Sequence, residues 1–314
     1  MSSLSLVFVL VGCGGKARPG RELTQSPGIP TEIVLERMIS GQILGRPLSN
    51  PTDLAIDNRG ALYLLDSGNK RVIWFNRDLA AVRDFSGEGS SIGKLGDPRG
   101  LAVDSERRVW VTDRESRLLV QCSDQLEYTM EIPFRDEADE FVYGRPAAIA
   151  VTEFGDIWVV DPDNHRVVTL DAAGQFDMFV GDAGSPGGQL REPSALALDR
   201  HDRIYVCDRG NHRVMVYDVR GGLVQEVKYQ SVNAPTAVAI DPSGRVWVLE
   251  EDSSKLHCLS NNGELLAALG PTISGADQPL LDPSDLVFLP DGRLVISDTG
   301  RSRLLVCRVT SSTD

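Results

Sequence analysis

Short apolar runs separated by turn residues recur along the chain between Thr31 and Thr310. Six segments begin with a proline, continue into an apolar strand, and reach an acidic residue 15 positions later, at the end of a β-branched or aromatic strand. Turns rich in Gly, Asn and Asp follow, and they lead to a third and a fourth strand. No convincing helical periodicity interrupts this pattern. The six proline–acid pairs are Pro51 and Asp66, Pro98 and Asp113, Pro146 and Asp161, Pro193 and Asp208, Pro235 and Glu250, and Pro283 and Asp298.

The repeat length predicts the fold. Successive prolines lie 47, 48, 47, 42 and 48 residues apart, and four-stranded repeats of roughly 40–50 residues are typical of propeller blades. The sixth repeat supplies three strands and ends near Thr310, whereas an additional strand at residues 32–39 precedes the first proline. We expect this strand to complete the last blade and close the ring. The prediction is an all-β, six-bladed β-propeller of four-stranded blades over residues 31–314.

Two recurring positions are predicted to pack the blades. The fourth residue after each proline is small or β-branched, as expected near the axis, and the ninth residue after each acid is apolar. Of the five cysteines, which include no CxxC pair, three are therefore interpreted as core residues and Cys258 is left without a role. The near-axis set is Ala55, Ala102, Ala150, Ala197, Ala239 and Val287; the packing set is Phe75, Cys122, Leu170, Tyr217, Leu259 and Cys307; and Cys207 falls in a second strand.

The turn after the second strand resembles the signature of NHL repeats. The match is full in Asp161-Pro-Asp-Asn-His-Arg-Val and Asp208-Arg-Gly-Asn-His-Arg-Val, and partial after Asp66 and Asp298. The glycine-rich segment 181–193 is similar to an NHL connector. Because the pattern recurs in several blades, we interpret its residues as architecture: Asn bonds the turn, and Asp pairs with Arg across strands two and three. These predicted structural residues are Asp66, Asn69, Arg71, Asp161, Asn164, Arg166, Asp208, Asn211, Arg213, Asp298 and Arg303.

The N-terminus suggests export. An apolar run, residues 4–11, leads to Leu10-Val11-Gly12-Cys13, which resembles the lipobox of bacterial lipoproteins. The resemblance implies that Cys13 is diacylated and becomes the mature N-terminus, on the periplasmic or cell-surface side of a bacterial membrane. Residues 1–13 are thus predicted to be a signal segment and 14–30 a flexible tether. The alternative is a frayed tail without processing.

The net charge limits which classes of partner the chain is expected to bind. The 314 residues carry 32 Lys and Arg against 45 Asp and Glu, a net charge of −13, which counts against nucleic acid or another polyanion. No stretch of 18 apolar residues predicts a membrane-spanning helix. We therefore expect a protein or a small non-polyanionic ligand as partner, and membrane contact only through the N-terminal lipid. The sequence does not indicate an oligomeric state.

Two acids mark a candidate site at the channel mouth. The second residue after the proline is acidic only in blades one and six, as Asp53 and Asp285, and ring closure makes these blades neighbours. With Arg99 of blade two they are expected to form a polar arc. Carboxylates and backbone carbonyls suit a hard cation, so Ca²⁺ is a candidate ligand at Asp53 and Asp285, although the fold requires no cofactor. The alternative is that these acids bond backbone N–H groups or pair with Arg99.

The function prediction weighs binding against catalysis. Amidoglycolate lyases, which resemble this fold, hold zinc with histidines, but none of the four histidines lies at the start of a first strand. Residues 133–145 form an acidic and aromatic connector that is either a recognition loop or a solvated link. We predict a non-catalytic binding or scaffold module. The alternative is a metal-assisted lactonase or lyase of the gluconolactonase or amidoglycolate lyase type at the channel mouth, and RNA binding is the least favoured reading.

Overall fold

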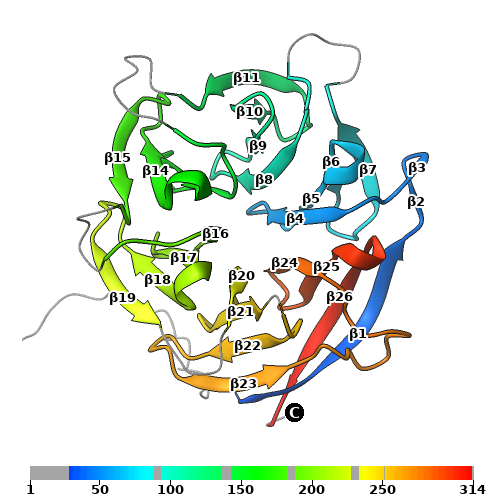
Figure 1. Cartoon of the computed structure of the whole chain (residues 1–314). Helices are drawn as coiled ribbons and strands as arrows, with labels where there is room; N and C mark the ends of the chain where they lie inside the picture. Colours follow the sequence, from blue (N-terminus) through cyan, green and yellow to red (C-terminus); the bar gives the residue numbers. More distant parts are fainter. Residues whose placement is uncertain are drawn as a thin grey trace, which may run out of the picture.

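The computed structural model describes residues 28–87, 93–135, 143–182, 188–227, 233–250 and 252–312. Six antiparallel four-stranded sheets stand around a central axis (Figure 1), which confirms the predicted six-bladed propeller. Over these ranges there is no α-helix, and no helix is long and apolar enough to cross a membrane. The predicted signal segment and most of the tether lie outside the described residues.

The strands follow the predicted repeat. Blade one contains β4 (Pro51–Ile56), β5 (Leu62–Asp66), β6 (Arg71–Phe75) and β7 (Ala81–Phe85), and blade two contains β8 (Pro98–Val103), β9 (Val109–Asp113), β10 (Leu118–Cys122) and β11 (Tyr128–Pro133). Blade three contains β12 (Ile149–Val151), β13 (Ile157–Asp161), β14 (Arg166–Leu170) and β15 (Phe176–Val180), and blade four contains β16 (Pro193–Leu198), β17 (Ile204–Asp208), β18 (Arg213–Tyr217) and β19 (Leu223–Val227). Blade five contains β20 (Pro235–Ile240), β21 (Val246–Glu250), β22 (Leu256–Leu259) and β23 (Leu265–Leu269).

Blade six closes the ring. It combines β24 (Pro283–Phe288), β25 (Leu294–Asp298) and β26 (Arg303–Ser311) with the N-terminal β1 (Pro30–Ser40), which runs antiparallel to β26 on the outer edge (Figure 1). This confirms the predicted closure, and β1 begins two residues earlier than expected. A small hairpin, β2 (Gln42–Ile43) and β3 (Arg46–Pro47), links β1 to blade one.

The predicted turns after strand two are single 3₁₀ turns in four blades. They are η1 (Ser67–Asn69), η2 (Pro162–Asn164), η3 (Arg209–Asn211) and η4 (Thr299–Arg301). Each is followed by one residue in the left-handed conformation, with φ between 48° and 57°. This reversal returns the chain directly into strand three.

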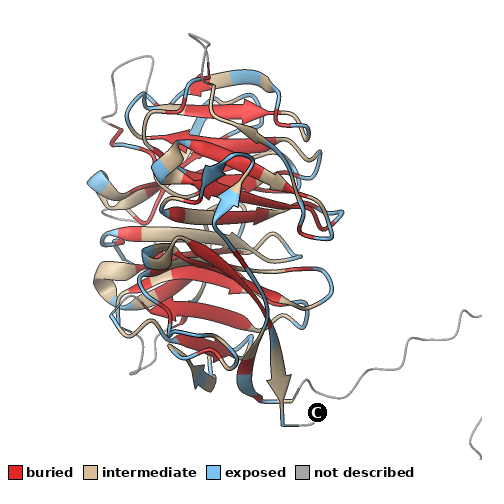
Figure 2. Cartoon of the chain, turned by 90° about the vertical axis from the view of Figure 1, so that its right-hand side faces the viewer, coloured by how far each residue is buried: buried red, intermediate tan, exposed pale blue. Residues whose placement is uncertain are grey.

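Apolar clusters between neighbouring blades hold the ring. The second strand of each blade is buried along its whole length, and the third strand is buried at most positions. Figure 2 shows these buried segments in the middle of the blades. Each fully buried Val, Leu, Ile, Phe or Met side chain among them stabilises the fold by roughly 1.5–3 kcal/mol relative to leaving it exposed. Cys122, Cys207, Cys258 and Cys307 are fully buried free thiols within these clusters, and burial raises the pKa of Cys122, Cys258 and Cys307 to about 12.

Candidate functional site

The acid that ends strand two, here called the signature acid, fastens the connector of its own blade. In all six blades its carboxylate accepts a hydrogen bond from the backbone N–H of the residue 17 positions earlier, two residues before the proline. The distances are 2.8 Å from Ser49 to Asp66, 2.7 Å from Arg191 to Asp208 and 2.7 Å from Leu281 to Asp298. The connector between blades is therefore pinned where it enters strand one.

The signature arginine completes this arrangement in four blades. Its Nε donates to the acid, at 2.8 Å for Arg71, 3.3 Å for Arg166, 2.6 Å for Arg213 and 2.6 Å for Arg303. The signature asparagine was predicted to bond backbone groups of the turn. In the structure its side-chain amide donates to the same carboxylate, and the amides of Asn69 and Asn211 also donate to backbone carbonyls of the connector. The predicted Asp–Arg pairing is thus present in the structure.

Blades two and five replace the arginine differently. Asp113 of blade two accepts from the backbone of Ser116 at 2.9 Å. In blade five, Glu250 accepts from Ser253 and lies 3.3 Å from Nε2 of the buried His257. This imidazole was not predicted from the sequence, although Glu250, which stands where the other blades have the shorter Asp, signals a different partner.

Asp53 and Asp285 lie together, as ring closure predicts. Asp285 Oδ2 accepts from the backbone N–H of Leu54 at 2.8 Å, and Asp53 Oδ1 accepts from that same N–H at 2.9 Å. Asp53 Oδ2 accepts from the N–H of Leu101 in blade two at 2.7 Å. Burial raises the pKa of Asp53 to about 6, and burial together with the adjacent Asp53 raises the pKa of Asp285 well above its usual range.

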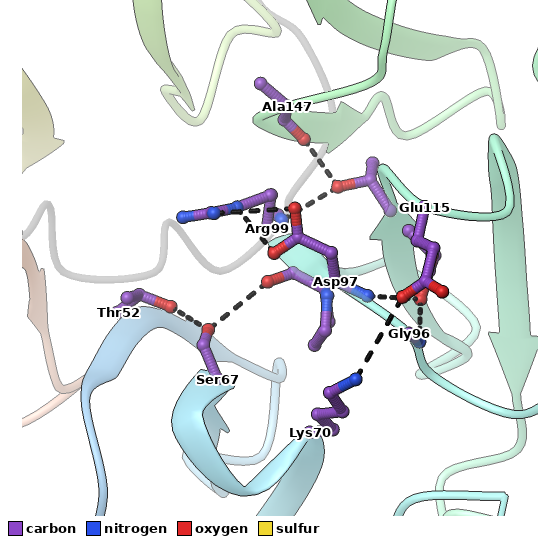
Figure 3. A network of polar contacts seen from close by, with 12 residues as sticks. Thr52, Ser67, Lys70, Gly96, Asp97, Arg99, Glu115 and Ala147 are labelled. Atoms are coloured by element: carbon purple, nitrogen blue, oxygen red, sulfur yellow. Dashed lines mark hydrogen bonds and ion pairs between the residues drawn. The ribbon is translucent and has the colours of Figure 1, made fainter.

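Arg99 does not join the two acids. Its Nε lies 3.0 Å from Oδ1 of Asp97, and both side chains are about two-fifths exposed (Figure 3). The structure therefore brings two of the three predicted residues together and gives the third a local partner. Among the described residues, no three His, Cys, Asp or Glu side chains gather as a metal site. A Ca²⁺ ion at Asp53 and Asp285 would need carbonyl or water oxygens for its remaining ligands.

The first strands enclose a central cavity of about 440 Å³. Such a volume suits a small ligand. The six near-axis residues predicted from the sequence all line it. One end of the cavity is polar, and the other is apolar. The polar end has Thr52, Asp53, Arg99, Ser194, Thr236 and Asp285, and the apolar end has Ile56, Val103, Val151, Leu198, Ile240 and Phe288.

Side chains at the polar end also tie several blades to the next one. Ser284 donates to the Thr52 carbonyl at 2.7 Å, across the closure of the ring. Imidazoles that follow the signature 3₁₀ turns of blades three and four make similar ties: Nδ1 of His165 accepts from the Glu192 N–H and Nδ1 of His212 from the Ala234 N–H, both at 3.1 Å. These ties were not predicted, because they depend on the angle between blades.

A second recurrent acid, in the turn between strands one and two, was also missed. Asp104 accepts from Trp110 Nε1 at 3.0 Å, and Asp241 accepts from Trp247 Nε1 at 3.1 Å. In blade three Thr152 stands at this position, and Nε1 of the buried Trp158 has no hydrogen-bond partner among the described residues. The recurrence of Asp at the sixth residue after the proline was a signal in the sequence.

The acidic and aromatic connector is described only at its ends, and residues 136–142 lie outside the described part. Phe134 and Tyr143 are buried, with ring centroids 5.1 Å apart, and Tyr143 packs edge-on against Phe179. These two aromatic side chains therefore belong to the packing between blades two and three.

Six four-stranded blades around a cavity lined by their first strands define a six-bladed β-propeller. The NHL repeat model matches residues 48–75 and 190–217, which are the first three strands of blades one and four with their signature turns. The predicted NHL repeats are thus confirmed in these two blades, within a six-bladed propeller. It is 28% identical over 90 residues to NHL repeat-containing protein 3 of Homo sapiens, and this match spans 24% of the chain and 26% of the human protein. The protein of the same name from Mus musculus is also 28% identical, over 92 residues, or 25% of this chain and 26% of that protein.

Solved structures share the fold at low sequence identity. A streptogramin B lyase has a TM-score of 0.64 at 14% identity, covering 87% of this chain and 98% of that one. A virginiamycin B lyase from Staphylococcus aureus has 0.63 at 14% identity, covering 89% and 100%. A gluconolactonase from Xanthomonas campestris has 0.64 at 16% identity, covering 90% and 97%. At this identity the likeness concerns the fold alone.

Proposed function

We propose that this chain is an exported, lipid-anchored NHL propeller that acts as a non-catalytic binding scaffold for a protein partner. The observation that carries the proposal is the fastening of the connector by the signature acid in all six blades. It places the loops between blades on a stiff frame at one end of the propeller. We call this end, with its signature turns and strand-one starts, the mouth face.

The mouth face is suited to recognition because loops on a rigid scaffold commonly carry binding residues. It presents charged side chains on the signature turns, among them Lys70 and Glu115, whose side chains are 55% and 68% exposed (Figure 3). The match to NHL repeats supports a protein partner, since NHL propellers are often protein-binding modules.

A pair of charge reversals in blade two tests the proposal. Glu115 lies on the mouth face, and Glu127, with a side chain 71% exposed, lies beyond the opposite end of β10. Glu115→Lys is expected to lower recovery of the partner from solubilised membranes, whereas the matched Glu127→Lys is expected to leave it unchanged. Equal recovery with both variants would refute binding through the mouth face.

The second candidate is a metal-assisted lactonase or lyase at the same end. The observation in its favour is the carboxylate pair on the wall of a cavity of about 440 Å³. Asp53 and Asp285 would supply two oxygen ligands to a divalent cation that orients and polarises a carbonyl. Turnover of lactones with added Ca²⁺ or Mg²⁺, lost in Asp53→Asn, would support this function and would refute the non-catalytic scaffold.

A further inference from the structure

Two carboxylates meet at one amide where the ring closes. Asp285, from blade six, and Asp53, from blade one, both accept from the N–H of Leu54, at 2.8 and 2.9 Å. The second oxygen of Asp53 continues to the N–H of Leu101 at 2.7 Å. The two side chains therefore link blades six, one and two in sequence, at the boundary where the two ends of the chain complete the ring.

One amide hydrogen cannot neutralise two carboxylates. Two anions held this close in a protein wall repel each other strongly, and in such pairs one group keeps its proton. A shared proton removes the repulsion and adds an O–H···O hydrogen bond between the two acids. The geometry at Leu54 thus favours a singly protonated pair.

No cation packed around the pair compensates it within the described residues. Arg99 on β8 lies against Asp97, and Arg301 after β25 contacts Pro279 and Gln278. The neighbouring β20 and β16 present Thr236 and Ser194 to the cavity. The other acids on adjoining strands have their own partners: Asp66 pairs with Arg71, Asp298 with Arg303, and Glu250 with Ser253 and His257. Burial, together with the charge of Asp285, raises the pKa of Cys207, which stays a thiol.

We propose that Asp53 and Asp285 share a single proton and form a pH-sensitive latch across the closure of the ring. With the proton in place, the acids stay together and hold the starts of β4 and β8. When the second carboxylate ionises, repulsion parts them and weakens their hydrogen bonds to Leu54 and Leu101. The latch regulates the stiffness of the polar end of the cavity. This proposal goes beyond the scaffold role, and both tests below use the protein without a binding partner.

The stability of the fold is expected to depend on pH because the folded chain binds the shared proton more tightly than the unfolded chain does. Burial raises the pKa of Asp53, and burial together with repulsion from Asp53 raises the pKa of Asp285, so both lie above those of the unfolded chain. The stabilisation is fully present below the unfolded pKa, about 4, and is lost in two steps as pH rises through the folded pKa values, which are about 6 for Asp53 and well above the usual range for Asp285. The latch is therefore closed in acidic solution, and it opens as pH rises through the second ionisation of the pair.

The first test compares urea unfolding of the wild type and Asp285→Asn between about pH 5 and 8. The Asn amide donates to Asp53 as the shared proton does, but it does not titrate. The wild-type midpoint is expected to fall as pH rises, and the variant to show a flatter profile. Glu115→Gln, which changes an exposed acid on the same face, is the control and should keep the wild-type slope. The other titratable groups are common to the wild type and Asp285→Asn, so equal slopes for these two proteins overturn the latch.

The second test uses the unmodified protein, in case Asp285→Asn does not fold. Hydrogen exchange at the Leu54 and Leu101 amides is measured over the same pH range and corrected for the intrinsic rate. Val238 occupies the position of Leu54 in blade five, and Ala237 precedes it where Asp53 precedes Leu54. Protection at Leu54 and Leu101 is expected to fall relative to Val238 as pH rises. A constant ratio overturns the latch.

Discussion

Arg71 is the most enclosed of the signature arginines, with a fully buried side chain. Its Nε donates to Asp66 at 2.8 Å and its Nη1 to Asp84 at 2.9 Å. The β2–β3 hairpin covers it and accepts two further bonds, through the carbonyls of Ile43 at 3.1 Å and Arg46 at 3.3 Å. One guanidinium thus holds the end of β5, the outer strand β7 and the hairpin together.

Arg71→Met keeps the aliphatic bulk but removes the charge and leaves Asp66 as a buried anion. Breaking a buried ion pair from one side costs about 3–5 kcal/mol, and we expect a loss of this size in the free energy of unfolding. Urea unfolding followed by tryptophan fluorescence measures it, because Trp74 lies on β6 itself. Asp66→Asn in the Arg71→Met background is expected to restore part of the loss, since Asn still accepts from Ser49 without carrying a charge.

The control for this experiment is an exposed pair that joins blade one to blade two. Arg83 and Glu127 lie 3.3 Å apart, with side chains 47% and 71% exposed, and Arg83→Met is expected to cost about 1 kcal/mol or less. If Arg71→Met costs no more than Arg83→Met, the signature Asp–Arg pair does not hold blade one, and the architectural interpretation of the repeat fails.

Three further predictions concern other parts of the ring. Gly100→Ala places a Cβ 2.3 Å from the Ala147 carbonyl oxygen, so thermal unfolding is expected at a temperature several degrees lower, consistent with about 1–3 kcal/mol from overpacking. Thr152→Asp with Asp156→Arg copies the Asp–Arg–Trp arrangement of blades two and five and supplies an acceptor to Trp158, which should raise stability by about 1 kcal/mol in urea unfolding; a lower midpoint contradicts this. Calcium at millimolar concentration is expected to raise the melting temperature if the channel carboxylates bind it, and an unchanged temperature removes the metal prediction.

The fold was predictable because its information is local and repeated. A proline followed 15 residues later by an acid marks strands one and two in every blade, and the incomplete sixth repeat requires an outer strand from elsewhere. Residues 32–39 were the apolar segment left over, and β1 provides that strand. Cys122 and Cys307 were placed in the core by the same register, without reference to their chemistry.

The site was only partly predictable because it depends on how blades meet. The proximity of Asp53 and Asp285 follows from ring closure alone, whereas their common donor, the Leu54 N–H, depends on the angle between blades six and one. Arg99 was expected to face these acids, but it forms an ion pair with Asp97, which lies two residues before it in the chain. The roles of His165 and His212 likewise depend on the following blade, so their shared position in the repeat was the available signal.

The most direct test of the scaffold proposal is site-specific photo-cross-linking in cells that produce the full chain. A photoreactive residue in place of Glu115 reports on the mouth face, and the same residue in place of Glu127 reports on the opposite end of blade two. We predict one discrete protein adduct from position 115 and none from position 127. Adducts of equal yield from both positions, or none from either, would contradict binding through the mouth face.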